Sequence, residues 1–364
     1  MYRNSYVEVN LDKLEHNIRY FQNRNDKKMI GVLKAHGYGL ADYVEADTLQ
    51  RLGVDFFGVS SLDEALRLRK HNIKGEILIL GYVPESALDI VRENDISMVT
   101  VSMDYIRHYD LRDVKIHIKI DTGMNRIGIR TDEVKEALDI LLKKNAKVRG
   151  VMSHLSSADC DEEYTKYQYE LFKKAVKELD YDFKYIHISS TDGSIILHDD
   201  ICNYERIGLG LLGYSSYHTD LLPCVSLKSE VINVKQIEKG EAVSYGRHYI
   251  SDGTGYILTI PLGYADGFYR SNTGKKVYIN GEYGTIVGSI CMDQMMIHTE
   301  KYYEVGTVVE LIGEHISAKD RAKELNTITY ELLTSLSERL TRVYIKDNKV
   351  IKKIDLRFEK SFYE

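Results

Sequence analysis

Short apolar runs alternate with amphipathic segments through the first two-thirds of this 364-residue chain. The apolar runs predict strands near Met29–Lys34, Phe56–Val59, Ile77–Leu80, Ser97–Val101, Val114–Ile120, Val148–Met152, Tyr185–Ser189 and Tyr204–Ile207. Helical spacing of apolar residues predicts helices between them, for example at Ser61–His71, Glu85–Glu93, Asp132–Lys144 and Glu162–Leu179. This alternation favours an α/β fold with a closed parallel (β/α)8 TIM-like barrel. An open doubly wound sheet is the alternative, but no glycine-rich dinucleotide motif follows an early strand.

The pattern changes after Pro223, where strands follow one another without regular helical connections. We predict strands at Val225–Ile237, Tyr256–Ile260, Lys276–Ile279, Glu282–Ile290, Met295–His298, Val308–Leu311, Arg342–Ile345 and Val350–Asp355. Two short helices are expected at Ser317–Leu325 and Tyr330–Arg339. The sequence therefore predicts a barrel domain over residues 9–222 and a mostly antiparallel β domain over residues 223–364. The N-terminal strand, within residues 1–8, is expected to pack on the second domain.

Composition excludes several classes of protein. The net charge of −6 comes without a basic block, so no nucleic-acid partner is expected. No apolar stretch has the length of a transmembrane helix, and no signal-peptide core precedes the first strand, so we expect no membrane association. The four cysteines are widely spaced and form no metal-type pairs, which favours reduced thiols, no metal site and a cytoplasmic location.

Polar residues follow most of the predicted barrel strands, at the end where barrel enzymes carry their active sites. They are Lys34, Tyr82, Lys119, Asp121, His154, Ser190, Thr191, Arg206 and Gly208. Lys34 closes an apolar run and begins the glycine-rich segment Lys34–Gly39. Partial desolvation at such a place lowers a lysine pKa and frees the amine for Schiff-base chemistry. An ordinary surface lysine is the alternative.

The strand around residues 114–121 places His117, Lys119 and Asp121 on one face, because side chains alternate along a strand. A lysine that faces the barrel interior is costly unless it is paired or neutralised. Arg126 follows the next turn and is a natural ligand for an anion or a phenolate. A solvated strand end with an ordinary ion pair explains these residues equally well.

Glycines and tyrosines mark the remaining candidate positions. Gly208 and Gly210 follow Arg206 at the end of the eighth strand, where backbone amides suit phosphate binding. In the second domain, Tyr245 and Tyr264 lie in glycine-containing turns, and Met292 lies in another polar turn. Phenols held in tight turns suggest a functional role, although a single tyrosine is more often packing.

Six segments together resemble the signature set of bacterial alanine racemases, which are pyridoxal 5′-phosphate enzymes with a barrel and a β domain. The segments are Leu33–Gly39, Lys119–Gly128, Arg206–Gly208, Val243–Gly246, Ile260–Gly267 and Cys291–Gln294. They occur in the family's order and roughly its spacing over nearly the whole chain. The resemblance implies racemisation of alanine, supply of D-alanine for peptidoglycan, and a homodimer with shared active sites.

The resemblance also implies roles for individual residues. Lys34 matches the lysine that bonds to the cofactor and acts as one acid/base, and Tyr245 of the partner subunit matches the second base. Arg206 matches the arginine at the pyridine nitrogen. Arg126 matches the arginine near the cofactor phenolate and the substrate carboxylate. Lys119 matches a lysine that is often carbamylated and holds that arginine.

Further matches concern binding. His154 matches a histidine beside the cofactor ring, and Tyr264 and Met292 match residues at the substrate entrance and carboxylate site. The positions that match phosphate ligands are Tyr38, Thr191, Gly208 and Leu209.

The chain departs from the family at four positions: His36 and Gly37, where asparagine and alanine are usual, Asn125 for a glycine, and Glu338 for a phosphate-binding tyrosine. A carboxylate would repel a phosphate, so we expect that Glu338 points away or that its segment is shifted, and serine or another small amino acid is an alternative substrate. A barrel decarboxylase of basic amino acids is opposed by Arg206, because those enzymes place a carboxylate at the pyridine nitrogen. A pyridoxal-phosphate carrier is opposed by the second domain, which carriers lack.

Overall fold

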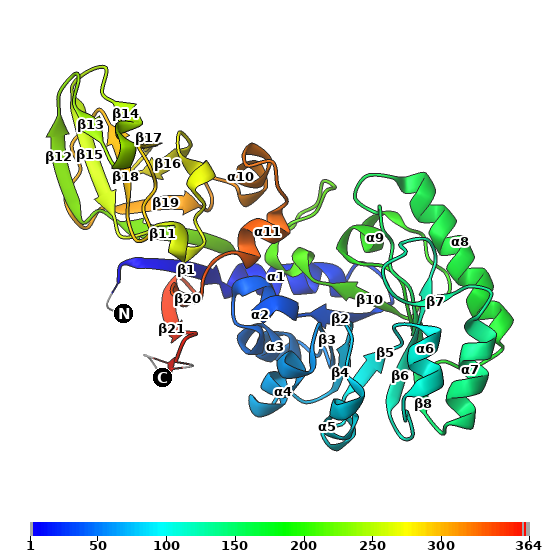
Figure 1. Ribbon diagram of the computed structural model, residues 1–364. Helices are drawn as coiled ribbons and strands as arrows, with labels where there is room; N and C mark the ends of the chain where they lie inside the picture. Colours follow the sequence, from blue (N-terminus) through cyan, green and yellow to red (C-terminus); the bar gives the residue numbers. More distant parts are fainter. Residues whose placement is uncertain (1–2, 359, 362–364) are drawn as a thin grey trace. The chain divides into compact units, whose positions relative to one another are not determined.

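The computed structural model describes residues 3–358 and 360–361 of the chain (Figure 1). Two compact units share these residues. The barrel unit consists of Leu14–Gly37 and Asp42–Leu222, and the C-terminal unit consists of Met1–Lys13, Tyr38–Ala41 and Pro223–Glu364. Parts of the predicted N-terminal strand (residues 1–2) and of the predicted second domain (359 and 362–364) lie outside the described residues.

Eight parallel strands form a nearly closed barrel, which confirms the predicted fold class (Figure 1). In spatial order they are β10 (Tyr204–Ile207), β2 (Lys28–Val32), β3 (Phe56–Val59), β4 (Glu76–Ile79), β5 (Ser97–Val99), β6 (Lys115–Asp121), β8 (Lys147–Met152) and β9 (Tyr185–His187). At the seam between β9 and β10, Arg206 N donates to Ser189 O at 3.0 Å and Asn203 N to Ile186 O at 3.1 Å. A short strand, β7 (Ile129–Arg130), pairs with the end of β6.

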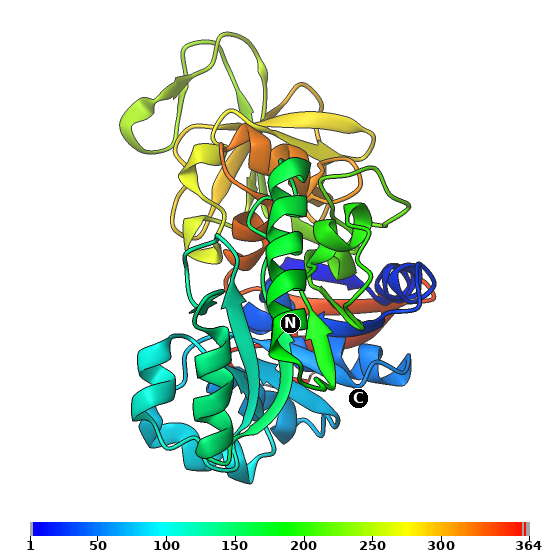
Figure 2. The ribbon, with the colours of Figure 1, turned by 90° about the vertical axis from the view of Figure 1, so that its right-hand side faces the viewer.

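The helix α1 (Leu11–Gln22) precedes the first barrel strand, and further helices follow the barrel strands. They are α3 (Asp42–Arg51), α4 (Leu62–Lys70), α5 (Leu88–Glu93), α6 (Met103–His108), α7 (Val134–Lys143), α8 (Glu162–Leu179) and α9 (Thr191–Ile196). Side-chain caps define several starts: Ser61 accepts from Glu64 N before α4, and Asp161 accepts from Tyr164 N before α8. Figure 2 shows α8 as the long green helix of this unit. In the described part of the chain, no helix is both long and apolar enough to cross a membrane.

Large apolar side chains fill the barrel interior. One buried cluster takes a residue from seven of the strands: Ile30, Phe56, Leu78, Val99, Met152, Tyr185 and Tyr204. Burial of this layer removes apolar surface from water and makes the barrel a packed core rather than a pore. His117 lies beside this apolar layer, in contact with the rings of Phe56 and Tyr185.

The C-terminal unit contains a mostly antiparallel sheet of eleven strands, as predicted. In spatial order they are β12 (Asn233–Ile237), β15 (Gly255–Ile260), β18 (Met295–Thr299), β17 (Glu282–Val287), β16 (Lys276–Ile279), β19 (Val308–Ile312), β11 (Val225–Glu230), β1 (Ser5–Asn10), β20 (Thr341–Lys346), β21 (Lys349–Asp355) and β22 (Lys360–Ser361). A separate hairpin pairs β13 (Ala242–Val243) with β14 (Tyr249–Ile250). Two helices, α10 (Ala318–Glu324) and α11 (Thr329–Thr334), complete the unit.

One predicted strand of this unit is wrong in its extent. The segment Val225–Ile237 forms two strands, because β11 pairs with β1 and β19 whereas β12 pairs with β15. Between them, Val231 N donates to Thr307 O at 2.9 Å and Ile232 N to Thr259 O at 2.8 Å. The chain therefore changes neighbours at these two residues, which an unbroken apolar pattern does not reveal.

Candidate active site

Lys34 follows β2 at the carboxyl end of the barrel strands. Its side chain is exposed, yet the surrounding protein displaces enough water to lower its pKa below 10.5. The charges of Arg126 and Arg206 lower this pKa further, and Glu64 partly opposes them. A lowered pKa leaves more of the amine neutral and nucleophilic. Lys34, Arg126 and Arg206 therefore form one electrostatic site in the barrel unit.

The residues after Lys34 form a left-handed helical turn, α2 (Lys34–Gly39). Positive φ values between 54° and 93° occur at all five of them: Ala35, His36, Gly37, Tyr38 and Gly39. This conformation costs a non-glycine residue roughly 1–2 kcal/mol, so it persists only where the surroundings impose it. Ala35 N donates to Glu64 Oε1 at 2.7 Å, and Gly37 N donates to Leu33 O at 2.9 Å. The turn fixes the direction in which the chain leaves Lys34.

A buried acidic pair on α3 packs against this turn. Glu45 leaves no room for a side chain at Gly37, because a Cβ there would lie 2.4 Å from its carboxyl oxygen. Asp42 accepts from Arg67 Nε at 3.0 Å, and Arg67 Nη1 donates to His36 Nδ1 at 2.6 Å. Burial raises the pKa of Asp42 and raises that of Glu45 well above 4.5. The unusual His36–Gly37 pair thus fits this acidic cluster.

Strand β6 carries Lys119 into the barrel. Its side chain is buried, and Nζ donates to Ile127 O at 2.7 Å. Burial lowers the pKa of Lys119 to about 8; Asp121 opposes this shift and Arg126 adds to it. Asn125 has a φ of 55°, a left-handed conformation that asparagine adopts more readily than most residues, which accounts for asparagine in place of a glycine.

Arg206 is buried at the end of β10 and donates to four acceptors. They are His187 Nδ1 at 2.8 Å, His154 Nδ1 at 2.9 Å, Ser153 O at 2.9 Å and Ile188 O at 2.7 Å. Burial lowers the pKa of Arg206 to about 10, so the guanidinium remains charged at neutral pH. Burial and the Arg206 charge lower the pKa of His154 well below 6.5 and keep its imidazole neutral.

Three of the four predicted phosphate ligands lie in the barrel unit. Thr191 begins α9, and its hydroxyl accepts from Gly210 N at 3.0 Å. Gly208 and Leu209 lie at the start of the short helix η2 (Leu209–Leu212). The hydrogen bond between Gly210 N and Thr191 links α9 to the loop after β10. The fourth predicted ligand, Tyr38, belongs to the C-terminal unit.

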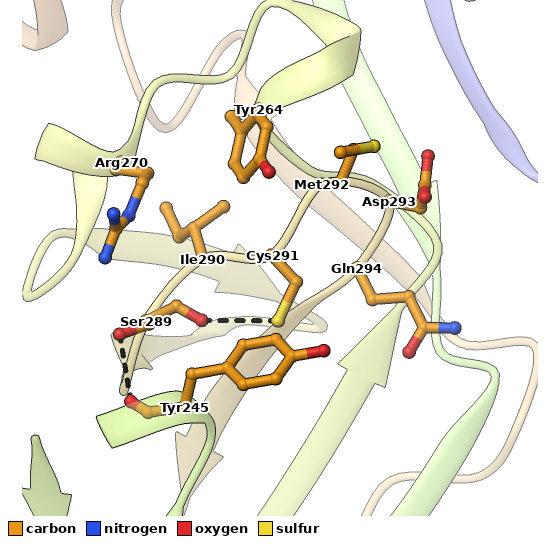
Figure 3. Close-up of a pocket in the computed structure, with 9 residues that line it drawn as sticks. All are labelled: Tyr245, Tyr264, Arg270, Ser289, Ile290, Cys291, Met292, Asp293 and Gln294. Atoms are coloured by element: carbon orange, nitrogen blue, oxygen red, sulfur yellow. Dashed lines mark hydrogen bonds between the residues drawn. The ribbon is translucent and has the colours of Figure 1, made fainter. Parts of the chain in front are cut away.

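The C-terminal unit has a cavity of about 590 Å³ that contains the other predicted site residues (Figure 3). Its lining residues are Tyr245, Tyr264, Arg270, Ser289, Ile290, Cys291, Met292, Asp293 and Gln294. Ser289 Oγ donates to Tyr245 O at 3.2 Å, and Ser244 Oγ donates to Ser289 O at 2.6 Å. The backbone of Tyr245 is therefore held while its side chain is 76% exposed, which leaves the phenol accessible to another molecule.

The turns that carry Tyr264 and Met292 are bound to each other. Tyr264 N donates to Cys291 O at 3.0 Å, and Ala265 N donates to Met292 O at 3.1 Å. The approach is so close that a Cβ at Gly263 would lie 2.2 Å from Cys291 O. This contact explains a glycine beside Tyr264.

An ion cluster that sequence reasoning missed supports these turns. The buried carboxylate of Asp266 accepts from Arg3 Nη1 at 2.5 Å and from Gly263 N at 2.9 Å. Arg339 bridges Asp266, with Nε at 3.6 Å, and Asp293, with Nη2 at 2.5 Å. Arg3 and Arg339 lie more than 300 residues apart in sequence, so no local pattern signals that they meet here.

Arg342 holds the segment after α11, where the predicted helix Tyr330–Arg339 is wrong beyond Thr334. Its buried guanidinium donates to the carbonyl oxygens of Gly39, Leu336, Ser337 and Leu340, at 2.6–2.9 Å. Leu336 O and Ser337 O accept from this side chain on β20, and Ser337 N donates to Asp266 O, so the helical pattern of hydrogen bonds does not continue beyond α11. Glu338 is exposed on this segment, and its charge raises the pKa of Arg342, which burial lowers to about 10.

Tyr38 is buried against this part of the C-terminal unit. Its ring lies 6.0 Å from that of Tyr330 on α11, and the two planes are tilted by 53°. Tyr344 Oη donates to Leu40 O nearby. The predicted phosphate ligand Tyr38 thus lies on a short segment that Arg342 and Tyr344 anchor.

The two units, each taken by itself, define a class of protein. One is a parallel barrel with a lysine, an arginine and neutral histidines at its catalytic end. The other is a β unit that presents a phenol beside a polar cavity. In residues 3–358 and 360–361 no cluster of histidine, cysteine and carboxylate side chains could hold a metal ion. The arrangement is that of a barrel enzyme with a reactive lysine.

Comparisons with known proteins identify the family. The model of the alanine racemase N-terminal domain matches residues 9–216, and that of the C-terminal domain matches residues 224–344. An alanine racemase of Staphylococcus epidermidis is 38% identical over 95% of this chain and 96% of its own. The crystal structure of alanine racemase from Bacillus anthracis with bound L-Ala-P has a TM-score of 0.93 and 33% identity, covering 99% of this chain and 100% of that chain.

The chain belongs to the alanine racemase family. It is an isomerase that interconverts L- and D-alanine, and it depends on pyridoxal 5′-phosphate. The donor set of the barrel unit fits this cofactor. Lys34 offers an amine with a lowered pKa to an aldehyde, and Arg206 offers a buried, charged donor that has no proton-accepting form at neutral pH.

Proposed function

We propose that the protein racemises alanine with two bases, Lys34 on one face of the substrate and Tyr245 of the partner subunit on the other. Racemisation removes the α-proton from one face and returns a proton to the opposite face, so two bases avoid turning the substrate over. Lys34 Nζ would exchange one proton and the Tyr245 hydroxyl the other. The observation that carries this proposal is the lowered pKa of Lys34 beside Arg126 and Arg206.

The bound cofactor supplies an electron sink that makes the α-proton acidic. We assign Arg206 to its pyridine nitrogen, His154 to its ring, and Arg126 to its phenolate and the substrate carboxylate. Tyr264 and Met292 are assigned to the substrate entrance and carboxylate site, and the phosphate is assigned to Tyr38, Thr191, Gly208 and Leu209. Because Arg206 is held by four acceptors, it would keep the pyridine nitrogen unprotonated, moderating the sink and suppressing side reactions.

Lys119 is proposed to carry a carbamate that holds Arg126. With a pKa of about 8, a sizeable share of the amine is neutral near physiological pH, and carbon dioxide reacts with the neutral amine. The reaction releases one proton and replaces a buried cation with an anion. This change would offset the cost of burying Lys119 among cations.

The cellular role is proposed from the activity. The product D-alanine would serve peptidoglycan synthesis in the cytoplasm, and the enzyme would act as a homodimer with shared sites. The exposed phenol of Tyr245 supports a shared site, because an exposed side chain can contact a substrate that is bound by the partner subunit. The domain bounds 9–222 and 223–364 stay a prediction.

Exchange of the α-proton in deuterated water tests the function. We expect L-alanine to take up deuterium and to yield D-alanine when pyridoxal 5′-phosphate is present. L-Serine, offered in parallel, should react more slowly. Bound cofactor without exchange on either amino acid would overturn the assignment of substrate.

The variant Tyr245→Phe tests the second base. Removing one hydroxyl should lower racemisation in both directions by about 10²–10⁴-fold, the usual contribution of an acid/base group, because one face of the substrate loses its proton donor. Cofactor bound to Lys34 should keep its absorbance. Near-normal turnover in both directions would contradict the role of Tyr245.

A further inference from the structure

A chain of hydrogen bonds leads from Arg206 into the barrel. Arg206 Nη1 donates to His187 Nδ1 at 2.8 Å, and His187 Nε2 lies 3.0 Å from His117 Nδ1. All three side chains are buried. Nothing in the proposed chemistry uses His117, although it shares a strand face with Lys119.

The donors and acceptors permit one assignment of protons along this chain. A guanidinium has donors only, so His187 Nδ1 accepts and its Nε2 carries the proton. His187 Nε2–H then donates to His117 Nδ1, and the proton of His117 must be on its Nε2. A second proton on either ring would set two donors against each other, so both imidazoles are neutral.

Burial supports the neutral state of both rings. It lowers the pKa of His117 to about 3 and that of His187 well below 6.5, and the charge of Arg206 adds to each shift. Arg149 is the other cation that lowers the pKa of His117. The ring of His117 also contacts the rings of Phe56, at 5.9 Å, and Tyr185, stacked at 5.3 Å.

The ring of His117 occupies space that requires a glycine on the neighbouring strand. Gly150 pairs with His117 in the register between β6 and β8. A Cβ at Gly150 would lie 2.5 Å from His117 Nδ1, the atom that accepts from His187. In the described part of the chain, His117 Nε2 has no protein acceptor, so the bond to His187 is the polar contact that this ring makes.

We propose that His117 is a positioning residue that acts through His187 on Arg206. It accepts the Nε2 proton of His187 and thereby holds His187 in the tautomer whose Nδ1 can accept from the guanidinium. Without this acceptor the buried Nε2 proton of His187 would have no partner, which raises the energy of this tautomer relative to the one whose Nδ1–H would repel Arg206. The consequence for catalysis rests on the proposed placement of Arg206 at the pyridine nitrogen.

The first test is the protonation of the rings in the wild-type protein. In a sample with ¹⁵N-labelled histidine, His187 and His117 should each show a bare Nδ1 and a protonated Nε2 from pH 6 to pH 9. A protonated Nδ1 on His187, or a cationic His117, would overturn the proposal. This measurement needs no racemase activity, so it remains decisive even if the proposed function fails.

The second test compares two variants at one position. His117→Asn keeps an oxygen that can accept from His187, whereas His117→Leu has a similar volume to histidine and no acceptor. Only the leucine variant should lose the single tautomer of His187. It should also form about tenfold more pyruvate per D-alanine, which corresponds to about 1.4 kcal/mol, because a displaced Arg206 lets the pyridine nitrogen take a proton.

The pyruvate arises from side transamination, in which alanine gives up its amino group to the cofactor and water supplies the keto oxygen. Equal tautomers and equal pyruvate ratios in both variants would overturn the proposal. If the leucine variant does not fold, Gly150→Ala serves in its place, because the added Cβ displaces His117 Nδ1.

Discussion

Glu45 is a buried carboxyl group whose protonation affects the stability of the barrel unit. It has 1% exposure and lies on α3 with Asp42, whose charge adds to the effect of burial on its pKa. In an unfolded chain the carboxyl ionises near pH 4.5, and in the folded protein it ionises at a higher pH. Below pH 4.5 the carboxyl group is protonated in both states and does not lower the free energy of unfolding. As the pH rises from 4.5 towards the folded pKa, ionisation in the unfolded chain lowers that free energy.

Glu45→Gln should remove this loss, because an amide does not ionise. We expect the variant and the wild type to have similar stability at pH 4, and the variant to be more stable by about 1–2 kcal/mol at pH 8. Calorimetric melting temperatures across this range would measure the difference. Asp47→Asn, at a position on the same helix with 60% side-chain exposure, is the control and should show no such trend. A difference for Glu45→Gln that does not change with pH would contradict the argument.

Sequence reasoning located residues at strand ends better than residues that support them. Lys34 follows an apolar run, Arg206 lies near the end of the eighth predicted strand, and the alternation along a strand already set Lys119 apart. His187 occupies an inward position of a predicted strand, but one histidine there does not reveal its contact with Arg206. The partners of Asp266 could not be predicted, because they come from distant parts of the chain.

The left-handed turn α2 begins at Lys34 in the barrel unit and ends at Gly39 in the C-terminal unit. Its last residue, Gly39, has a φ of 93°, and a Cβ there would lie 2.9 Å from Leu333 O on α11. Gly39 therefore needs glycine for two reasons, conformation and space. Gly53, which follows α3, has a similar φ of 85° but open space around its missing Cβ.

Gly39→Ala and Gly53→Ala form a matched pair that separates these reasons. Gly53→Ala should cost about 1 kcal/mol of stability, the usual strain of a left-handed alanine, and should leave cofactor binding unchanged. Gly39→Ala should cost about 1–3 kcal/mol and weaken cofactor binding, because the turn after Lys34 must move away from α11. Thermal unfolding and titration with pyridoxal 5′-phosphate would measure both. Equal effects of the two changes would show that contact with α11 is unimportant.

Elements were predictable where local pattern decides them. β3, β10, β16 and α8 have the predicted bounds, because strong apolar runs and a side-chain cap define them. α6 and α9 lie where helices between strands were expected, but their bounds were not predicted, since one or two turns give too little periodicity. The early end of α11 was not predictable either, because the carbonyl oxygens that follow it accept from the side chain of Arg342 on β20, a contact that no apolar pattern reveals.

At the scale of the whole molecule, the proposed dimer can be tested by mixing two inactive variants. Lys34→Ala lacks one proposed base and Tyr245→Phe lacks the other. If each site takes its phenol from the partner subunit, a mixed dimer has one intact site and one doubly altered site. After random exchange of equal amounts, the activity should recover to about one quarter of the wild-type level. Absence of recovery despite demonstrated exchange of subunits would argue against shared sites.

The two compact units include one segment that the sequence pattern did not indicate. The change from alternating helices and strands to strands alone marks Pro223. No pattern indicates that residues 38–41, within the first third of the chain, belong with the C-terminal unit. Their place depends on Arg342 and Tyr344, which bind the backbone carbonyls of Gly39 and Leu40.

The position of β1 in the sheet of the C-terminal unit affects how the chain is made. β1 lies between β11, to which it is antiparallel, and β20, to which it is parallel. About 330 residues separate it from β20, and a ribosome that adds about 5–20 residues per second needs roughly 15–65 s to make them. The barrel strands can pair during that time, whereas β1 emerges first and waits for its neighbours. An early strand with unpaired edges is a natural target for a chaperone and a point at which newly made chains can aggregate.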